Sequence, residues 1–167
     1  MLEIMILYLI WEYELTMYYI RKKIHDVFGD FSKPSFGALR PALMKLERLG
    51  YIKTRKSISD GGRITCHYSL TPNGKKAFKQ MLLEDLSANP INLLQSCAVR
   101  IIASEYLSKD EQAELINNLL RQVEYHKIEA ENRMENNKNM RTYQRIMIDN
   151  LSAQYGNFMK LLERLAK

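Results

Sequence analysis

The sequence predicts a mainly α-helical fold: an N-terminal winged helix-turn-helix, with three helices and a two-stranded wing, followed by an all-helical C-terminal region. In support of the winged helix, an amphipathic segment ends at Gly50, and a basic strand, a Ser-Asp-Gly-Gly turn and a returning strand follow at once. Basic side chains also gather there, because residues 31–79 carry eleven Lys and Arg against two acids, a balance of +9, whereas the whole chain carries +6. Apolar residues that recur every three or four positions after residue 90 predict the helical region.

Four helices are expected in the N-terminal half, over residues 2–12, 16–29, 35–50 and 71–86. Thr16 and Ser35 are of the type that caps a helix N-terminus, and a glycine ends both the second and the third helix. Pro41 fits the third helix only if its first turn is irregular, because proline lacks a backbone donor.

Residues 51–58 and 63–70 are expected to form the strands of the wing, with Asp60-Gly61 supplying the positive φ of the tip. Along the second strand, apolar residues from Ile64 to Leu70 alternate with polar ones. One face of this strand is therefore expected to pack inward, and the other to meet solvent or a ligand.

Residues 87–90 have the composition of a domain boundary. We therefore divide the chain into a winged-helix DNA-binding domain over residues 1–86 and a helical domain, for dimerisation and possible effector binding, over residues 87–167. The second domain is expected to begin with one helix over residues 91–107.

A capping box from Ser108 to Glu111 opens a long helix, and an Asn-rich break at residues 136–139 separates it from the last one. Both long helices carry apolar seams, which predict an antiparallel hairpin that seals a homodimer. The residues expected at the dimer contact are Leu115, Leu119, Val123, Met147, Leu151, Tyr155, Phe158 and Leu162.

Composition and spacing argue against other classes of protein. The basic pI of about 9.3 favours anionic partners. The apolar residues 2–11 are too few for a bilayer span, which needs about 20, and Glu3 replaces the basic lead-in of a secretion signal, so we expect a cytoplasmic protein with no membrane partner. His25, His67 and His126 lack metal-ligand spacing, and phosphate-binding loops and nucleophile elbows are missing from the sequence, so we expect no enzyme, metal or cofactor.

The run SFGALRPALMKLERLGYI, residues 35–52, contains a Ser and Gly, a Pro-Ala-Leu, a Leu and a Gly-apolar-Ile. Together with residues 9–20 and 62–74, it resembles the PadR family of bacterial transcription regulators over about half of the chain. Arg40 stands where that family's motif has an aromatic, and Met17 stands where it has a glycine. The resemblance implies a DNA-binding winged helix, and the two departures leave the DNA sequence that it reads open.

In a winged helix, the N-terminal residues of the third helix enter the major groove and reach the bases. The wing cations are expected at the minor groove or at neighbouring phosphates, and the resemblance adds Tyr18 as a phosphate ligand. Capping by Ser35, packing by Tyr18 and a merely solvated wing remain alternatives. The expected DNA-binding residues are Tyr18, Lys33, Ser35, Phe36, Ala38, Arg40, Lys45, Arg55, Lys56 and Arg63.

The resemblance implies a homodimeric repressor that binds a pseudo-palindromic operator in double-stranded DNA and leaves it when a small aromatic effector binds. Tyr8 and Trp11, with aromatic residues of the tail, are expected to line the effector cavity, and core packing is the alternative for each ring. Three other functions stay open: an effector-independent regulator or activator, a winged-helix protein-interaction module, and a basic nucleic-acid binder without sequence preference. Specific operator binding separates them.

Overall fold

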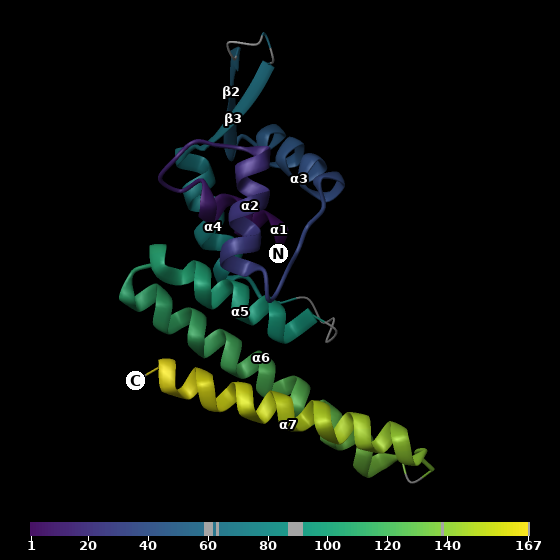
Figure 1. The fold of residues 1–167 in the computed structure, drawn as a ribbon. Coiled ribbons are helices and arrows are strands. Elements are labelled where there is room, and N and C mark those ends of the chain that lie inside the picture. The colour runs from purple at the N-terminus through teal and green to yellow at the C-terminus, as the bar shows by residue number, and fades with distance from the viewer. Residues whose placement is uncertain (59–61, 63, 87–91, 138, 167) are drawn as a thin grey trace. The chain divides into compact units, whose positions relative to one another are not determined.

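The computed structural model in Figure 1 describes residues 1–58, 62, 64–86, 92–137 and 139–166. The chain forms two compact units. The N-terminal unit comprises Met1–Glu84 and Ala98–Tyr106, and the C-terminal unit comprises Asp85–Cys97 and Leu107–Lys167. The expected boundary at residues 87–90 lies outside the described residues, and the segment 98–106, which we assigned to the second domain, groups with the first unit.

The N-terminal unit has the predicted winged-helix elements, together with a strand that the sequence did not indicate. In chain order they are α1 (Leu2–Leu9), β1 (Leu15–Thr16), α2 (Met17–Phe28), α3 (Phe36–Arg48), β2 (Ile52–Ile58), β3 (Ile64–Leu70) and α4 (Pro72–Leu83). The sheet is antiparallel in the order β1-β3-β2. Because β1 has two residues, it is too short to show a strand periodicity, and its sequence gave no signal.

The core of this unit forms where the apolar stripes of its helices meet. In α1, Ile4 to Leu7 are all buried, which agrees with a helix that is apolar nearly all round. α2 and α3 bury one stripe each, and α4 adds large side chains. These stripes consist of Ile20, Ile24 and Phe28 in α2, Leu39, Leu43 and Leu46 in α3, and Ala77, Phe78 and Leu82 in α4.

The predicted helix caps are confirmed. Thr16 Oγ1 accepts a hydrogen bond from Tyr19 N at 3.4 Å, and Ser35 Oγ accepts one from Ala38 N at 3.2 Å. Pro41 lies inside α3 on its exposed side. In the first turn of α3 the amides of both Ala38 and Leu39 donate to Ser35 O, at 3.2 and 3.1 Å.

The inward face expected for the wing exists only at its base. Ile52, at the start of β2, is 2% exposed, whereas Ile58 and Ile64, which pair at the outer end, are 75% and 65% exposed. The expectation that Ile64 packs inward is therefore wrong, because the wing extends beyond the helices that could cover its outer half. The Asp60-Gly61 tip lies outside the described residues.

α3, which is the expected recognition helix, meets the wing strands β2 and β3 and the start of α4 at one junction. Gly50 has a φ of +71°, a conformation that favours glycine, and turns the chain from α3 into β2. Tyr51 N donates to Leu46 O at 2.9 Å, and Thr71 N donates to Tyr51 O at 3.0 Å. The Thr71 hydroxyl donates to Gly50 O at 2.7 Å and accepts from Gly74 N at 3.0 Å, so one side chain joins the end of α3 to the start of α4.

The C-terminal unit contains the first residues of α5 (Leu93–Ala103), whereas the rest of α5 and the 3-10 turn η2 (Ser104–Tyr106) group with the N-terminal unit. α6 (Lys109–Asn136) and α7 (Thr142–Leu165) complete the C-terminal unit. The capping box is confirmed, since Ser108 Oγ accepts from Glu111 N and the Glu111 carboxylate accepts from Ser108 N. α6 and α7 pack side by side as an antiparallel hairpin (Figure 1). Ser152 of α7 donates to the Glu131 carboxylate of α6 at 2.9 Å, and Lys127 bonds the same carboxylate at 2.6 Å.

Most of the residues expected at a dimer contact are buried within the single chain. Met147 is 64% exposed, and Leu151 and Phe158 are half-buried. The other five are at most 1% exposed, because the seam that we interpreted as a subunit contact is the inner seam of the folded chain. These five are Leu115, Leu119, Val123, Tyr155 and Leu162.

No helix in the described ranges is long and apolar enough to cross a membrane.

We expect Gly74→Ala to lower the free energy of unfolding by about 1–3 kcal/mol or more, as overpacking of a rigid site does. A Cβ at this position would lie 2.0 Å from Tyr51 O, which is backbone and cannot rotate away. Urea denaturation followed by the fluorescence of Trp11, the single tryptophan and a residue of the same unit, measures the loss.

Gly156→Ala in α7 is the matched control. Its Cβ would meet Lys127 Cε at 3.6 Å, an ordinary contact with a flexible side chain. The gain in helix propensity should raise stability by up to about 1 kcal/mol, measured by far-UV circular dichroism. Equal destabilisation by both substitutions would contradict the role assigned to the junction.

Candidate nucleic-acid interface

The N-terminal half of α3 presents the predicted contact residues to solvent. Ser35, Phe36, Ala38 and Arg40 are all exposed, while Leu39 on the opposite side of the helix is buried. Among the described residues, Arg40 has neither an ion pair nor a hydrogen bond. Its guanidinium is therefore available for a phosphate or for the two acceptors of a guanine.

A groove of about 610 Å³ separates α3 from the wing. It brings together two of the predicted cations, Arg40 from α3 and Lys56 from β2. Met44, which the sequence analysis did not select, lies in the same groove and is 63% exposed. An exposed methionine on a recognition helix suits an apolar contact such as a thymine methyl group. Glu47, Thr54, Cys66 and Tyr68 complete the lining.

The two neighbouring wing cations point to opposite faces of the sheet. Side chains alternate along a strand, so Lys56 faces the groove beside α3 and Arg55 faces the other side. There, Arg55 Nε and Nη2 donate to Glu14 Oε2 at 3.1 and 2.7 Å. This guanidinium holds the pKa of the Glu14 carboxyl below its usual value. Arg63, the third expected wing cation, lies outside the described residues.

A second basic hollow, of about 340 Å³, lies between α2 and the segment that leads into α3. It joins the predicted Tyr18 and Lys33, and it adds residues that we did not select, the cations Arg21 and Lys22 and the imidazole of His25. Spacings of three, four and seven residues from Tyr18 place these on one face of α2, a signal that the sequence already carried. Asp26 and Pro34 complete the lining.

Arg21 also packs over the exposed ring of Phe36, with 4.7 Å between its guanidinium carbon and the ring centroid. The first residue of α3 thereby contacts the basic face of α2. This contact connects the second hollow to the N-terminus of the recognition helix.

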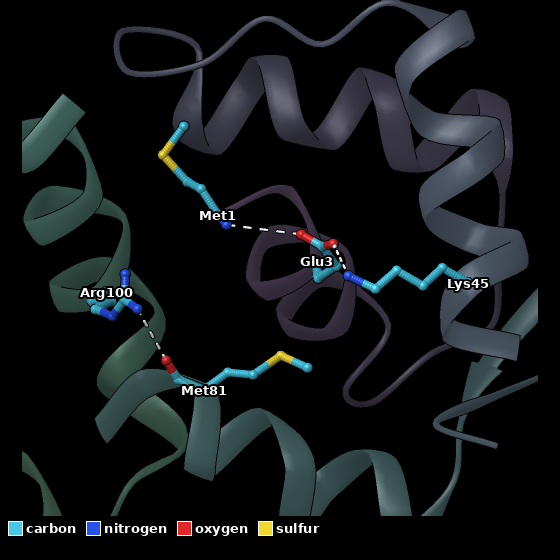
Figure 2. Close-up of polar contacts among 5 residues, drawn as sticks. All are labelled: Met1, Glu3, Lys45, Met81 and Arg100. Carbon is cyan, nitrogen blue, oxygen red and sulfur yellow. Dashed lines mark hydrogen bonds and ion pairs between the residues drawn. The ribbon is translucent and has the colours of Figure 1, made fainter. Parts of the chain in front are cut away.

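Lys45, like Arg55, is a predicted DNA ligand that is already paired with an acid. Its ammonium nitrogen lies 3.0 Å from Glu3 Oε1 of α1, and the same carboxylate lies 3.8 Å from the Met1 amine (Figure 2). Lys45 shares a hollow with Met81 and Arg100, separate from the groove that holds Arg40. A phosphate would have to compete with Glu3 for this lysine.

The two residues expected at an effector site, Tyr8 and Trp11, belong to an aromatic cluster. Trp11 stacks on Tyr106 with ring centroids 4.7 Å apart and also contacts Phe78 at 5.3 Å. The Tyr8 hydroxyl donates to the Glu105 carboxylate at 2.6 Å, and burial together with this acid raises the pKa of Tyr8. The rings thus pack against one another.

Comparison with known proteins gives a family and several similar folds. Residues 6–80 match the model of the transcriptional regulator PadR-like family. Similar solved structures include Bacillus subtilis PadR in complex with operator DNA (20% identity, TM-score 0.49, 99% of this chain and 96% of that chain). Another is smu.1604c from Streptococcus mutans UA159 (25% identity, TM-score 0.48, 99% and 98%). A third is B. subtilis PadR in complex with p-coumaric acid (20% identity, TM-score 0.43, 99% and 93%). Curated proteins gave no match.

The winged helix and its basic groove define a nucleic-acid-binding protein of the helix-turn-helix class. The match over residues 6–80 then assigns this N-terminal region to the PadR-like family of transcriptional regulators. Members of this family are DNA-binding regulators and not enzymes. The sequence-based prediction of the family and of the winged-helix fold is thereby confirmed.

Proposed function

We propose that the protein is a homodimeric, sequence-specific repressor that binds a pseudo-palindromic operator in double-stranded DNA. The observation that carries the proposal is the position of Arg40, exposed and unpaired among the described residues, in the groove that α3 shares with Lys56 of the wing. α3 enters the major groove, where Arg40 meets base edges. The cations of the α2 hollow bind the phosphate backbone beside it and fix the register of the protein on the duplex.

A fluorescence-anisotropy titration against the duplex upstream of the protein's own gene, with a scrambled duplex for comparison, tests the proposal at near-physiological salt. A preference of about 10³-fold or more supports a specific regulator. Equal affinity that collapses with salt would identify a basic binder without sequence preference. Absence of binding would favour the winged-helix interaction module.

Arg40→Ala is expected to reduce the preference for operator over scrambled DNA by about 1–3 kcal/mol, because it removes a contact to a base. Lys22→Ala is the matched control for a phosphate contact. It should weaken binding to both duplexes equally and lower the slope of log K against log salt by about one. The same anisotropy assay measures both variants. Equal losses on the two duplexes with Arg40→Ala would contradict base recognition by this residue.

A stripe of exposed apolar side chains on α7 supports the dimer. Tyr143, Met147, Leu161 and Leu165 are 84%, 64%, 40% and 49% exposed, and their spacing places them on one side of the helix. Half-buried Leu151 and Phe158 lie on the same side, which keeps three of the expected dimer residues in the proposal (Met147 included). Soluble monomers rarely expose a continuous apolar stripe, so we propose that a second copy covers it.

Met147→Glu is expected to raise the dissociation constant of the dimer by about tenfold or more, because it would bury a carboxylate without a partner. Sedimentation equilibrium measures the change. Met44→Glu is the control, since Met44 is as exposed, at 63%, and lies in the other unit. A dimer that is unaffected by Met147→Glu would exclude this side of α7 from the interface.

The most specific part of the proposal is that a small aromatic molecule releases the protein from DNA. Tyr8 and Trp11 remain the residues proposed to bind this molecule. It is supported by their position at the edge of an aromatic cluster that also offers polar atoms, the Tyr8 hydroxyl and the Glu105 carboxylate. Apolar walls with a few polar groups are typical of small-molecule sites. Because Trp11 is stacked on Tyr106, an aromatic ligand would have to take the place of one of these rings.

Calorimetric titration with phenolic acids is expected to give heat of binding with the wild-type protein and less with Trp11→Ala. In the anisotropy assay the same compounds should lower operator affinity, since a ligand shifts the equilibrium only by its preference for one state. Far-UV circular dichroism of Trp11→Ala controls for loss of fold. No heat with any member of the series would contradict effector control and favour an effector-independent regulator or activator.

A further inference from the structure

We propose that Arg55 is a positioning residue rather than a DNA ligand: its ion pair with Glu14 braces the wing from the side opposite the recognition helix. The proposal rests on the DNA-binding function proposed above and assigns a role to an acid, Glu14, that this function does not use. It also replaces the expectation that Arg55 contacts DNA.

The direction of the side chain is the first argument. Lys56 lines the groove beside α3, together with Thr54, Cys66 and Tyr68 of the same sheet face. Arg55 and its cross-strand partner His67 belong to the other face. A duplex seated in the groove meets the first face, so Arg55 points away from it.

The second argument is the span of the ion pair. β3 lies between β1 and β2, and Thr16, His67 and Arg55 stand opposite one another across the three strands. Glu14 directly precedes β1, and its carboxylate accepts from Arg55, which places it on the same face of the sheet as Arg55 and His67. The backbones of β1 and β2 are about 10 Å apart, twice the spacing of neighbouring strands. The Glu14–Arg55 pair crosses β3 and ties the two edges of the sheet together, with 2.7 Å between Nη2 and Oε2.

The third argument is that the wing needs support from the side. Its outer end is exposed, with Ile58 and Ile64 at 75% and 65%, whereas Ile52 at its base is buried. Tertiary packing therefore fixes only the base of the hairpin. The Glu14–Arg55 contact lies on the sheet face that is turned away from α3. It limits how far β2 can rotate, and so holds Lys56 of the same strand over the groove. The Ser57 hydroxyl and His67 Nε2, 2.9 Å apart, add a second cross-strand contact on the braced face.

Glu14→Gln separates this proposal from simple electrostatics. Removal of an acid near a DNA-binding surface should raise affinity, because it makes the protein more positive. A brace predicts the opposite result, because the amide forms a weaker bond with Arg55 and the wing becomes less fixed. Exposed ion pairs contribute little to stability, so we expect the variant to stay folded, with an unchanged Trp11 fluorescence melt.

The anisotropy assay compares four proteins: wild type, Glu14→Gln, Arg55→Glu and the double swap Glu14→Arg with Arg55→Glu. We expect operator affinity to fall about two- to fivefold with Glu14→Gln, as for the loss of one exposed pair. It should fall further with Arg55→Glu and return close to wild type in the swap, which restores the pair and the net charge. Glu131→Gln is the control, since it removes the same charge from a half-buried pair with Lys127 in the other unit and should not weaken binding.

Hydrogen exchange of the β2 and β3 amides, measured without DNA, gives a second readout. We expect faster exchange in Glu14→Gln and wild-type exchange in the swap. Higher operator affinity with Glu14→Gln, or a swap that stays as weak as Arg55→Glu, would overturn the brace and make Arg55 a DNA ligand. If wild type binds no operator, the proposed function fails, whereas the exchange data still decide the brace: unchanged exchange overturns it.

Discussion

The junction between the recognition helix and the wing is the constraint on which the DNA-binding surface depends. The end of α3, the start of β2 and the start of α4 are in direct contact there. Tyr51 O accepts a hydrogen bond from Thr71 N and occupies the space that a Cβ of residue 74 would need. Gly50 can make its turn only with positive φ, and Gly74 is required because α4 starts against the backbone of Tyr51. The angle between α3 and the wing is therefore fixed by backbone contacts, which leaves the side chains of the groove free to vary with the DNA sequence to be read.

Features of the structure that arise from neighbours in sequence could be predicted. The Thr16 and Ser35 caps, the Ser108 capping box and the ends of α3 and α6 depend on residues within one helical turn, and all were found where expected. β1 could not be predicted, because it exists only through pairing with β3, more than 50 positions further along the chain. The apolar seam of α6 and α7 was interpreted as a subunit contact for a related reason. An apolar stripe indicates that a helix face is buried, but not whether the same chain or a second copy buries it.

The candidate interface shows the same division. The cations of α3 and the wing were selected from the sequence but those of α2 were missed, and the structure divides the selected ones into groups with different surroundings. Arg40 and Lys56 are unpaired among the described residues and share one groove, whereas Lys45 and Arg55 are held by Glu3 and Glu14. Each of those acids lies about 40 positions away in sequence, so no local pattern could reveal the pairs. The alternation of Lys56 and Arg55 along β2 was visible from the start, but only the lining of the groove indicates which face is which.

The position of β2 in the sheet has a consequence for the solubility of the molecule. In the order β1-β3-β2 this strand lies at an edge, and its seven residues are long enough to pair with a strand of another molecule. Lys53, Arg55 and Lys56 place positive charge along that edge, which is how natural sheets discourage edge-to-edge aggregation. Of these three side chains, Lys56 also lines the groove beside α3, so a substitution at this position would change both the affinity for a polyanion and the resistance to self-association.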